Sequence, residues 1–263
     1  MMSGMKGPVS GQAANRVWDG VYPTWSQACD AAQAVGGKGL GGEIWFQRIT
    51  GQLSDYREEI RVFGVAMPPR PSNLPMLCAY EKPASIVDFG GSSGWGWDYL
   101  RDSGSGGTVF SYVVVETREV VDYMKRAELQ APPVRYQTIE EPMDAADLLY
   151  CNSVLQYLGS NDPLLSLVER IQPETILLED LVGCSGEDFF TTQLFRGAAI
   201  PYRFLGLQVL LDDLAAQGYF ELVRYPYASP VKGVVAPMPM ENFPPTMQLR
   251  YSSSILLKRA CPK

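Results

Sequence analysis

Short apolar runs alternate with helix-like segments through most of this 263-residue chain. The early runs contain few polar residues, as expected for parallel strands that helices cover on both faces. This alternation predicts an α/β fold, doubly wound around a mostly parallel seven-stranded sheet. The strands are predicted at residues 85–89, 110–116, 134–138, 147–152, 175–181, 219–225 and 251–258.

Helical patterns fill the segments between these strands. They are predicted near residues 95–101, 119–129, 163–171 and 207–217. Asp162 precedes a proline and is predicted to cap the third helix, and Gly218 is predicted to end the fourth.

The N-terminal part of the chain has a different character. Thr24 is placed to cap a helix with apolar positions at i, i+3, i+4 and i+7, and a second helical stretch is expected near 54–65. Three prolines in residues 67–71 require an extended chain there. We therefore predict an N-terminal tail and helical cap over residues 1–71, and the main domain over residues 72–263. The proline-rich segment 228–247 is predicted to be a lid or binding loop.

Composition excludes several kinds of chemistry. The sequence has no histidine, which removes Ser-His-Asp and Cys-His catalysis and histidine metal sites. Its five cysteines form no CxxC pair, so we expect no disulfide framework, no metal site and a reducing, cytoplasmic location. A net charge of −7 argues against nucleic acid and anionic membranes as partners. No apolar run approaches the roughly 20 residues that span a bilayer, and the N-terminus lacks a signal-peptide core.

The most informative motif is Asp88-Phe89-Gly90-Gly91-Ser92-Ser93-Gly94, which ends the first predicted strand and opens a helix. Glycines allow a sharp turn and a close approach to a ligand, and a helix start offers unpaired N–H groups. The next strand ends in Glu116, roughly 20 residues further on, the spacing at which an acid can accept hydrogen bonds from a ribose diol. The alternative is a tight strand–helix turn and a solvated glutamate.

The glycine loop and Glu116 occur together with other short motifs, in an order that resembles class I methyltransferases dependent on S-adenosylmethionine (SAM). Within that class the chain is similar to a little-characterised family of bacterial methyltransferases. The resemblance covers residues 18 to about 227. It is carried by Trp18-x-Gly20-x-Tyr22-x-x-Trp25, the Asp88-Phe89-Gly90-Gly91 loop, Glu116, Ser153-Val154-Leu155-Gln156-Tyr157-Leu158, Ile200-Pro201-Tyr202 and Gly218-Tyr219.

The resemblance implies a set of cofactor contacts. Asp88 would order the loop or approach the methionine ammonium of SAM, with the loop residues beside the methionine, and Glu116 would bind the ribose. The third strand would bring Thr138, Ile139 and Glu140 near the adenine. The implied cofactor-binding residues are Asp88, Gly90, Gly91, Ser92, Gly94, Glu116, Thr138, Ile139, Asn152 and Ser153. Asn152 and Ser153 would face the reactive centre, although Asn152 is also a suitable helix cap.

Further residues are candidates for the substrate and for proton transfer. Trp95 and Trp97 follow the loop directly, where an indole can stack on a cation, fill the space of the cofactor or pack in the core. Gln156 is expected to line the pocket that Asn152 and Ser153 face, and Arg203 can hold a carboxylate or phosphate group of the substrate. The candidate catalytic residues are Tyr157, Glu179 and Tyr202. Glu179 and Asp180 should point to opposite faces of their strand, and either is also suited to cap the following turn.

The leading interpretation is a SAM-dependent methyltransferase that acts on a small-molecule or sugar-like metabolite. A second interpretation keeps the fold without SAM. In that case the cavity would support elimination or intramolecular cyclisation, such as aziridine ring closure in natural-product biosynthesis. A third interpretation is a non-catalytic partner of another enzyme of the same pathway.

Overall fold

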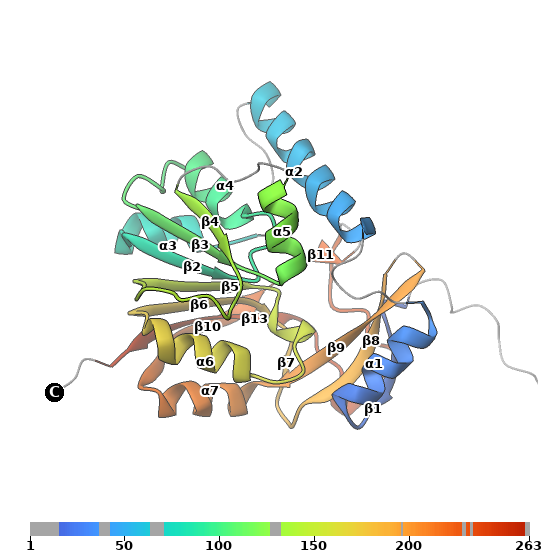
Figure 1. Ribbon diagram of the computed structural model, residues 1–263. Helices are drawn as coiled ribbons and strands as arrows, with labels where there is room; N and C mark the ends of the chain where they lie inside the picture. The colour runs from blue at the N-terminus through green and yellow to red at the C-terminus, as the bar shows by residue number, and fades with distance from the viewer. Residues whose placement is uncertain are drawn as a thin grey trace, which may run out of the picture.

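The computed structural model describes residues 16–36, 43–63, 71–126, 133–195, 197–227, 230–231 and 234–260. Its largest feature is a seven-stranded sheet in which five neighbouring strands are parallel and β13 is antiparallel to both of its neighbours. This arrangement confirms the predicted fold class (Figure 1). From one edge to the other the strands are β4 (Val134–Gln137), β3 (Ser111–Val115), β2 (Ser85–Phe89), β5 (Leu148–Asn152), β6 (Thr175–Leu181), β13 (Ser252–Arg259) and β10 (Tyr219–Tyr227).

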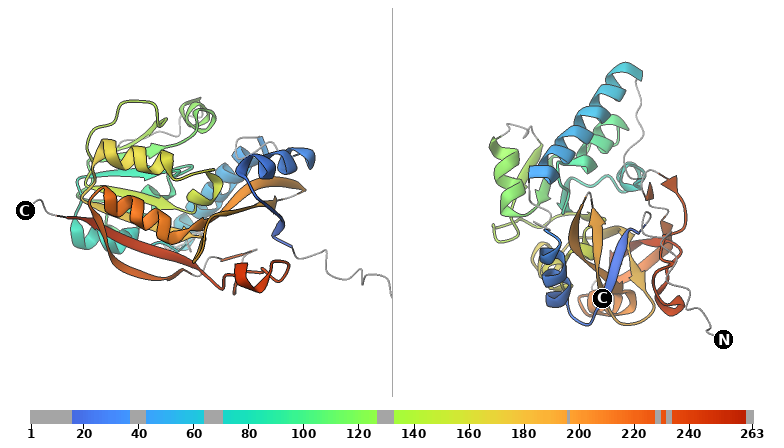
Figure 2. Two further views of the ribbon diagram at one scale, coloured as in Figure 1. Left: turned by 90° about the horizontal axis from the view of Figure 1, so that it is seen from below. Right: turned by 90° about the vertical axis from the view of Figure 1, so that its right-hand side faces the viewer.

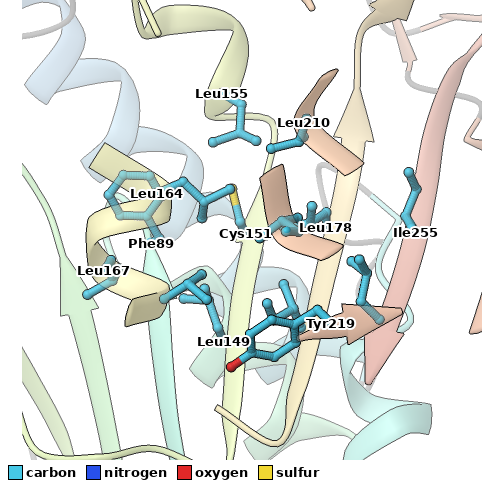
Figure 3. Close-up of a cluster of buried hydrophobic side chains, with 14 of the residues drawn as sticks. Phe89, Leu149, Cys151, Leu155, Leu164, Leu167, Leu178, Leu210, Tyr219 and Ile255 are labelled. Atoms are coloured by element: carbon cyan, nitrogen blue, oxygen red, sulfur yellow. The ribbon is translucent and has the colours of Figure 1, made fainter. Parts of the chain in front are cut away.

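Helices cover both faces of this sheet (Figure 1). One face packs against α3 (Leu74–Glu81), α4 (Trp95–Asp102) and α5 (Arg118–Arg126). The other face packs against α6 (Asp162–Ile171) and α7 (Leu207–Ala216). Figure 3 shows the second of these cores, where apolar side chains of the helices meet those of the strands. Its labelled residues are Phe89, Leu149, Cys151, Leu155, Leu164, Leu167, Leu178, Leu210, Tyr219 and Ile255.

The predicted helices are present, with two local corrections. Asn161, rather than Asp162, is the N-cap residue of α6, and the Asp162 carboxylate accepts a hydrogen bond from the Ser160 hydroxyl. The second helix, α2 (Glu43–Phe63), begins well before the predicted start at residue 54. The predicted extended segment 67–71 lies almost wholly outside the described residues. Gly218 follows α7 with a φ of 89°, as expected for a residue that ends a helix.

A second, four-stranded sheet was not predicted. It has the order β1 (Trp18–Tyr22), β8 (Phe189–Phe195), β9 (Ala198–Gly206) and β7 (Gly183–Cys184). Helix α1 (Trp25–Ala34) packs on it, and the Thr24 hydroxyl accepts the Gln27 N–H at 3.3 Å, which confirms the predicted cap. The N-terminal strand therefore shares a sheet with residues that follow β6 (Figures 1 and 2). The domain boundary at residue 71 stays a prediction.

The proline-rich segment predicted as a lid is described in part. It contains the two-stranded pair β11 (Pro230–Val231) and β12 (Val234–Val235), and later the short 3-10 helix η3 (Pro245–Met247). Met240 and Phe243 are buried in the apolar cluster of the second sheet. This part of the segment is therefore packed against the protein.

The contact between α4 and β3 leaves no room for a side chain at Gly96. A Cβ atom there would lie 2.0 Å from the hydroxyl oxygen of Tyr112, which is fully buried. We expect Gly96→Ala to lower the free energy of unfolding by about 1–3 kcal/mol because the buried ring must move. Urea unfolding measures this change.

The matched control is Gly51→Ala in α2, where an added methyl group meets no described atom within 4 Å. Alanine there should raise the free energy of unfolding by about 0.5–1 kcal/mol through its helix propensity. Equal stability of the two variants would show that the α4–β3 contact is looser than described.

Candidate active site

The glycine loop lies where β2 ends, at the carboxyl edge of the main sheet. Gly90 and Gly94 have φ values of 71° and 83°, and Ser92 has a φ of 55°, so three of its residues adopt left-handed backbone. A Cβ atom at Gly91 would lie 2.2 Å from a carboxylate oxygen of Asp88. The loop therefore needs glycine at position 91 because the backbone passes directly over that carboxylate.

Glu116 follows β3 and is bonded to this loop. Its Oε1 accepts the Ser92 N–H at 3.0 Å, and its Oε2 accepts the Thr117 N–H at 3.0 Å. Burial raises the pKa of this carboxyl group, and the two backbone hydrogen bonds offset part of the rise. Each carboxylate oxygen keeps a lone pair for a further donor. The acid and the loop that were singled out in the sequence therefore lie in direct contact.

Asp88 lies beneath the loop. It is 1% exposed, and its Oδ2 accepts a hydrogen bond of 2.7 Å from the Tyr112 hydroxyl. Burial raises the pKa of Asp88 from 3.8 to about 7, although the Tyr112 hydrogen bond favours the ionised form. The nearby charge of Glu116 adds to the rise. Both carboxyl groups that contact the loop, Asp88 and Glu116, therefore have raised pKa values because they are buried.

Of the residues predicted near the adenine, Thr138 belongs to a small polar cluster after β4. The buried Thr138 hydroxyl accepts from Arg118 at 3.2 Å and lies 3.3 Å from the Glu141 carboxylate, to which it donates. Arg118 and Glu141 form an ion pair at 3.2 Å. Ile139 packs against the core on the α6 side of the sheet, and Glu140 is exposed.

Asn152 ends β5 and is paired in register with Glu179 of β6. The Asn152 Nδ2 donates to the Tyr150 hydroxyl at 2.9 Å and to Glu179 at 3.3 Å. Glu179 is fully buried and also accepts from the Ser72 hydroxyl at 2.7 Å and from Asn73, through its backbone N–H at 2.9 Å and its side-chain Nδ2 at 2.8 Å. This carboxylate therefore joins the start of α3 to the carboxyl edge of the sheet.

The segment after β5 adds two more polar residues. Ser153 has a φ of 60°, and its N–H donates to the backbone oxygen of Glu179 at 2.9 Å. Gln156, 1% exposed, donates through Nε2 to the Ser153 hydroxyl at 2.9 Å and to the backbone oxygen of Asp180 at 3.4 Å. Asp180 accepts from the Ser252 hydroxyl of β13, so Glu179 and Asp180 have different partners.

Tyr157 and Tyr202, two of the candidate catalytic residues, meet at the second sheet. Their rings are perpendicular, with centroids 5.4 Å apart, and the Tyr157 hydroxyl donates to Gln193 at 3.0 Å. Tyr202 is 3% exposed within the aromatic cluster of that sheet. Arg203 is 1% exposed and is held by Asp188 at 3.2 Å and by Asn161 at 2.7 Å. Its charge is thus balanced inside the protein.

The two indoles after the loop pack on different neighbours. Trp95 contacts Tyr56 of α2 and Tyr99, at centroid distances of 5.3 and 6.0 Å. Trp97 contacts Tyr112 at 5.9 Å and joins the core on the α3 side of the sheet. Trp97 therefore packs in the core, whereas Trp95 is partly buried against two tyrosine rings.

The described ranges contain no group of three or more acidic or cysteine side chains placed to hold a metal ion. Within the same part of the chain, no helix combines the length and apolar character that crossing a membrane requires.

Searches with the sequence found no matching protein-family model and no matching curated protein. Solved structures with a similar arrangement include the Burkholderia thailandensis 1,6-didemethyltoxoflavin-N1-methyltransferase, with 15% identity over 83% of this chain and 90% of that chain and a TM-score of 0.48. Human N-acetylserotonin methyltransferase is 15% identical over 90% of this chain and 66% of that chain, with a TM-score of 0.46. The glycopeptide N-methyltransferase MtfA is 10% identical over 78% of this chain and 98% of that chain, with a TM-score of 0.48. At TM-scores below 0.5 these likenesses say nothing of this chain's ligands, which the site itself must indicate.

Several residues of the site were not singled out in the sequence. Tyr112 and Tyr150 lie inside strands and read there as ordinary apolar positions. Ser72 and Asn73 precede Pro75, a pattern typical of a helix start, but nothing in the sequence pairs them with Glu179, more than 100 residues away.

Asp88 gives the protein a pH-dependent stability. Because its folded-state pKa is raised, the folded protein favours the protonated form. The contribution of protonated Asp88 to the free energy of unfolding is fully present below pH 3.8 and is lost as the pH rises through about 7. Asp88→Asn has no proton to lose. Between pH 5 and pH 8.5 we expect the wild type to lose about 3 kcal/mol of unfolding free energy relative to this variant.

Chemical unfolding at several pH values tests this expectation. Asp144→Asn, at an exposed position, is the control and should follow the wild-type curve. Parallel curves for the wild type and Asp88→Asn would mean that Asp88 titrates at its ordinary pKa.

Proposed function

We propose that this protein is a SAM-dependent methyltransferase that acts on a small-molecule or sugar-like metabolite. The observation that supports it best is the hydrogen bond between the Glu116 carboxylate and the Ser92 N–H. It joins an acid at the end of one parallel strand to a glycine loop at the end of the adjacent strand. Ligands of open α/β sheets bind at this edge, and an acid in this position suits a ribose diol.

The residues present fit such a ligand. Glu116 has spare lone pairs on both carboxylate oxygens for the two ribose hydroxyls. The side-chain oxygens of Asn152 and Gln156 and the hydroxyl of Ser93 are buried and have no hydrogen-bond partner among the described residues. Buried polar atoms of this kind are usually satisfied by a ligand or by water. Several unpaired acceptors at one edge suit a ligand that carries an ammonium group and hydroxyls.

SAM supplies an already activated methyl group, so the demands on the protein are small. Glu116 and the loop would fix the nucleoside, and Thr138 and Ile139 would border the adenine. Asn152 and Tyr157 would lie toward the methyl acceptor. Orientation and the exclusion of water are the main contributions, and orientation alone can be worth roughly 7–11 kcal/mol of the barrier.

The SAM-independent alternative has one observation in its favour. A Cβ atom at Gly90 would lie 2.4 Å from the side chain of Val154, so the protein's own atoms approach the loop on that side. The tryptophan pair gives this alternative no support, because Trp95 and Trp97 pack on tyrosines. Folded protein that binds neither SAM nor S-adenosylhomocysteine would favour elimination or cyclisation chemistry over methyl transfer.

Glu116→Ala tests the ribose assignment. Hydrogen bonds to a charged group contribute about 1.5–3 kcal/mol, so we expect the affinity for S-adenosylhomocysteine to fall roughly 10- to 100-fold. Titration calorimetry measures the change. A thermal-shift series gives a second reading, since a ligand at 100 times its dissociation constant stabilises by about 2.7 kcal/mol.

Glu119→Ala is the matched control because Glu119 is exposed on α5, three residues further along the chain. It should bind S-adenosylhomocysteine as the wild type does. Unchanged affinity in Glu116→Ala would remove the ribose assignment.

A further inference from the structure

The position of Asn152 at the sheet edge is fixed by two strand pairings. In β5, Tyr150 pairs with Asp88 of β2, so Asn152, two residues later, is level with Gly90. On its other side Asn152 pairs with Glu179 of β6. The side chain therefore stands between the glycine loop and a buried carboxylate, at the edge where the proposed function places its reaction.

The chemistry of its neighbours sets the orientation of the Asn152 amide. Only the Nδ2 group can donate to the carboxylate of Glu179 and to the hydroxyl oxygen of Tyr150, at 3.3 and 2.9 Å. The amide oxygen must then turn away from Glu179. That oxygen is buried and has no hydrogen-bond partner in the part of the chain that the structure describes. Asn152 thus presents an acceptor that lacks a donor.

Glu179 is poorly suited to take a proton from a substrate. It accepts five hydrogen bonds, from the Ser72 hydroxyl, two groups of Asn73, the Tyr150 hydroxyl and the Asn152 amide. A carboxylate has about four lone-pair sites, so this one is saturated. It is also fully buried. Glu179 is instead suited to hold the neighbouring side chains in place.

We infer that Glu179 is a positioning residue that turns the Asn152 oxygen toward the substrate, and that the substrate group it receives is an amine. This inference rests on the proposed function and names its substrate class. An amine donates an N–H to Asn152 Oδ1 and keeps its lone pair for the methyl group. A hydroxyl nucleophile needs a base to take its proton, which saturated Glu179 does not supply.

The transfer balances without a base. The nitrogen lone pair forms the new N–C bond while the S–C bond of the methyl donor breaks, and that electron pair stays on sulfur. The product is an ammonium ion that keeps its hydrogen bond to Asn152 and later releases a proton to water. Gln156, four residues after Asn152, has a second oxygen of this kind. Its Nε2 is directed to Asp180 and Ser153, so its buried oxygen is also left without a donor among the described residues.

The test uses two adenosyl ligands that differ at the transfer position. S-adenosylhomocysteine has a bare sulfur there. In sinefungin a carbon that carries an ammonium group replaces the methylated sulfur, so its added N–H groups lie where methyl donor and acceptor meet. We expect the wild type to bind sinefungin about 10-fold more tightly than S-adenosylhomocysteine, as measured by titration calorimetry.

Two variants and one control separate positioning from general stability. Asn152→Ala and Glu179→Gln should reduce the preference for sinefungin to near 1, with the affinity for S-adenosylhomocysteine changed less than about 3-fold. Tyr225→Phe removes the hydroxyl that accepts from Asn73 at 2.6 Å and leaves Asn152 and Glu179 in contact. This control should keep the full wild-type preference even if its melting temperature falls.

Three results would overturn the inference. One is S-adenosylhomocysteine binding with no preference for sinefungin in the wild type. The second is a preference that both variants keep. The third is an equal loss of both ligands in Asn152→Ala with unchanged binding of 5′-methylthioadenosine, which would assign the oxygen to the methionine ammonium instead. In all three the proposed function stands, whereas wild-type protein that binds no adenosyl ligand overturns the proposed function itself.

Discussion

A carboxylate that folding removes from water must receive hydrogen bonds from the protein, and this requirement organises the carboxyl edge of the main sheet. Asp88 and Glu179 are 1% and 0% exposed. Burial of an ionised group without partners costs several kcal/mol, so each needs donors in fixed places. The donors come from other elements: Tyr112 of β3 for Asp88, and Ser72 and Asn73 at the start of α3 for Glu179. The edge is therefore held by bonds that cross between elements.

The carboxylates of this edge differ in how many lone pairs remain free after their hydrogen bonds within the protein. Glu116 is held by two backbone N–H groups, one on each oxygen, and keeps capacity for a ligand. Glu179 receives most of its donors from side chains and has no capacity left. The same type of side chain is thus suited to binding in one strand and to positioning in another. The number and kind of its donors decide between the two roles.

The parallel part of the fold could be predicted because its strands are buried on both faces. Strands 85–89 and 175–181 have the predicted bounds, because in both cases the run of mostly apolar residues coincides with the whole strand. The second sheet was missed because its strands, such as Phe189–Phe195, mix aromatic and polar residues, and because β1 and β8 are far apart in sequence. Helix α3 was missed because residues 74–80 are apolar on all sides and show no helical period.

In the site, too, contacts between adjacent strands could be predicted from the sequence, whereas contacts between distant segments could not. The proximity of Glu116 to the glycine loop could be foreseen because adjacent parallel strands end at one edge. The network around Glu179 could not, because it depends on contacts between residues more than 100 positions apart. The sequence therefore made Glu179 a candidate for proton transfer from its residue type and its place near the end of a predicted strand, without its hydrogen-bond partners.

The composition and the geometry of this edge lead to the same kind of reaction. A chain without histidine lacks the side chain that most often moves protons near neutral pH. In the structure Glu179 is saturated with donors, and Asp88 is buried beneath the loop and bonded to Tyr112. Instead, the side-chain oxygens of Asn152 and Gln156 are acceptors that have no donor among the residues that the structure describes. With Glu179 saturated and Asp88 buried, the described part of this edge favours a nucleophile that already carries its lone pair, because binding and alignment are then sufficient for reaction.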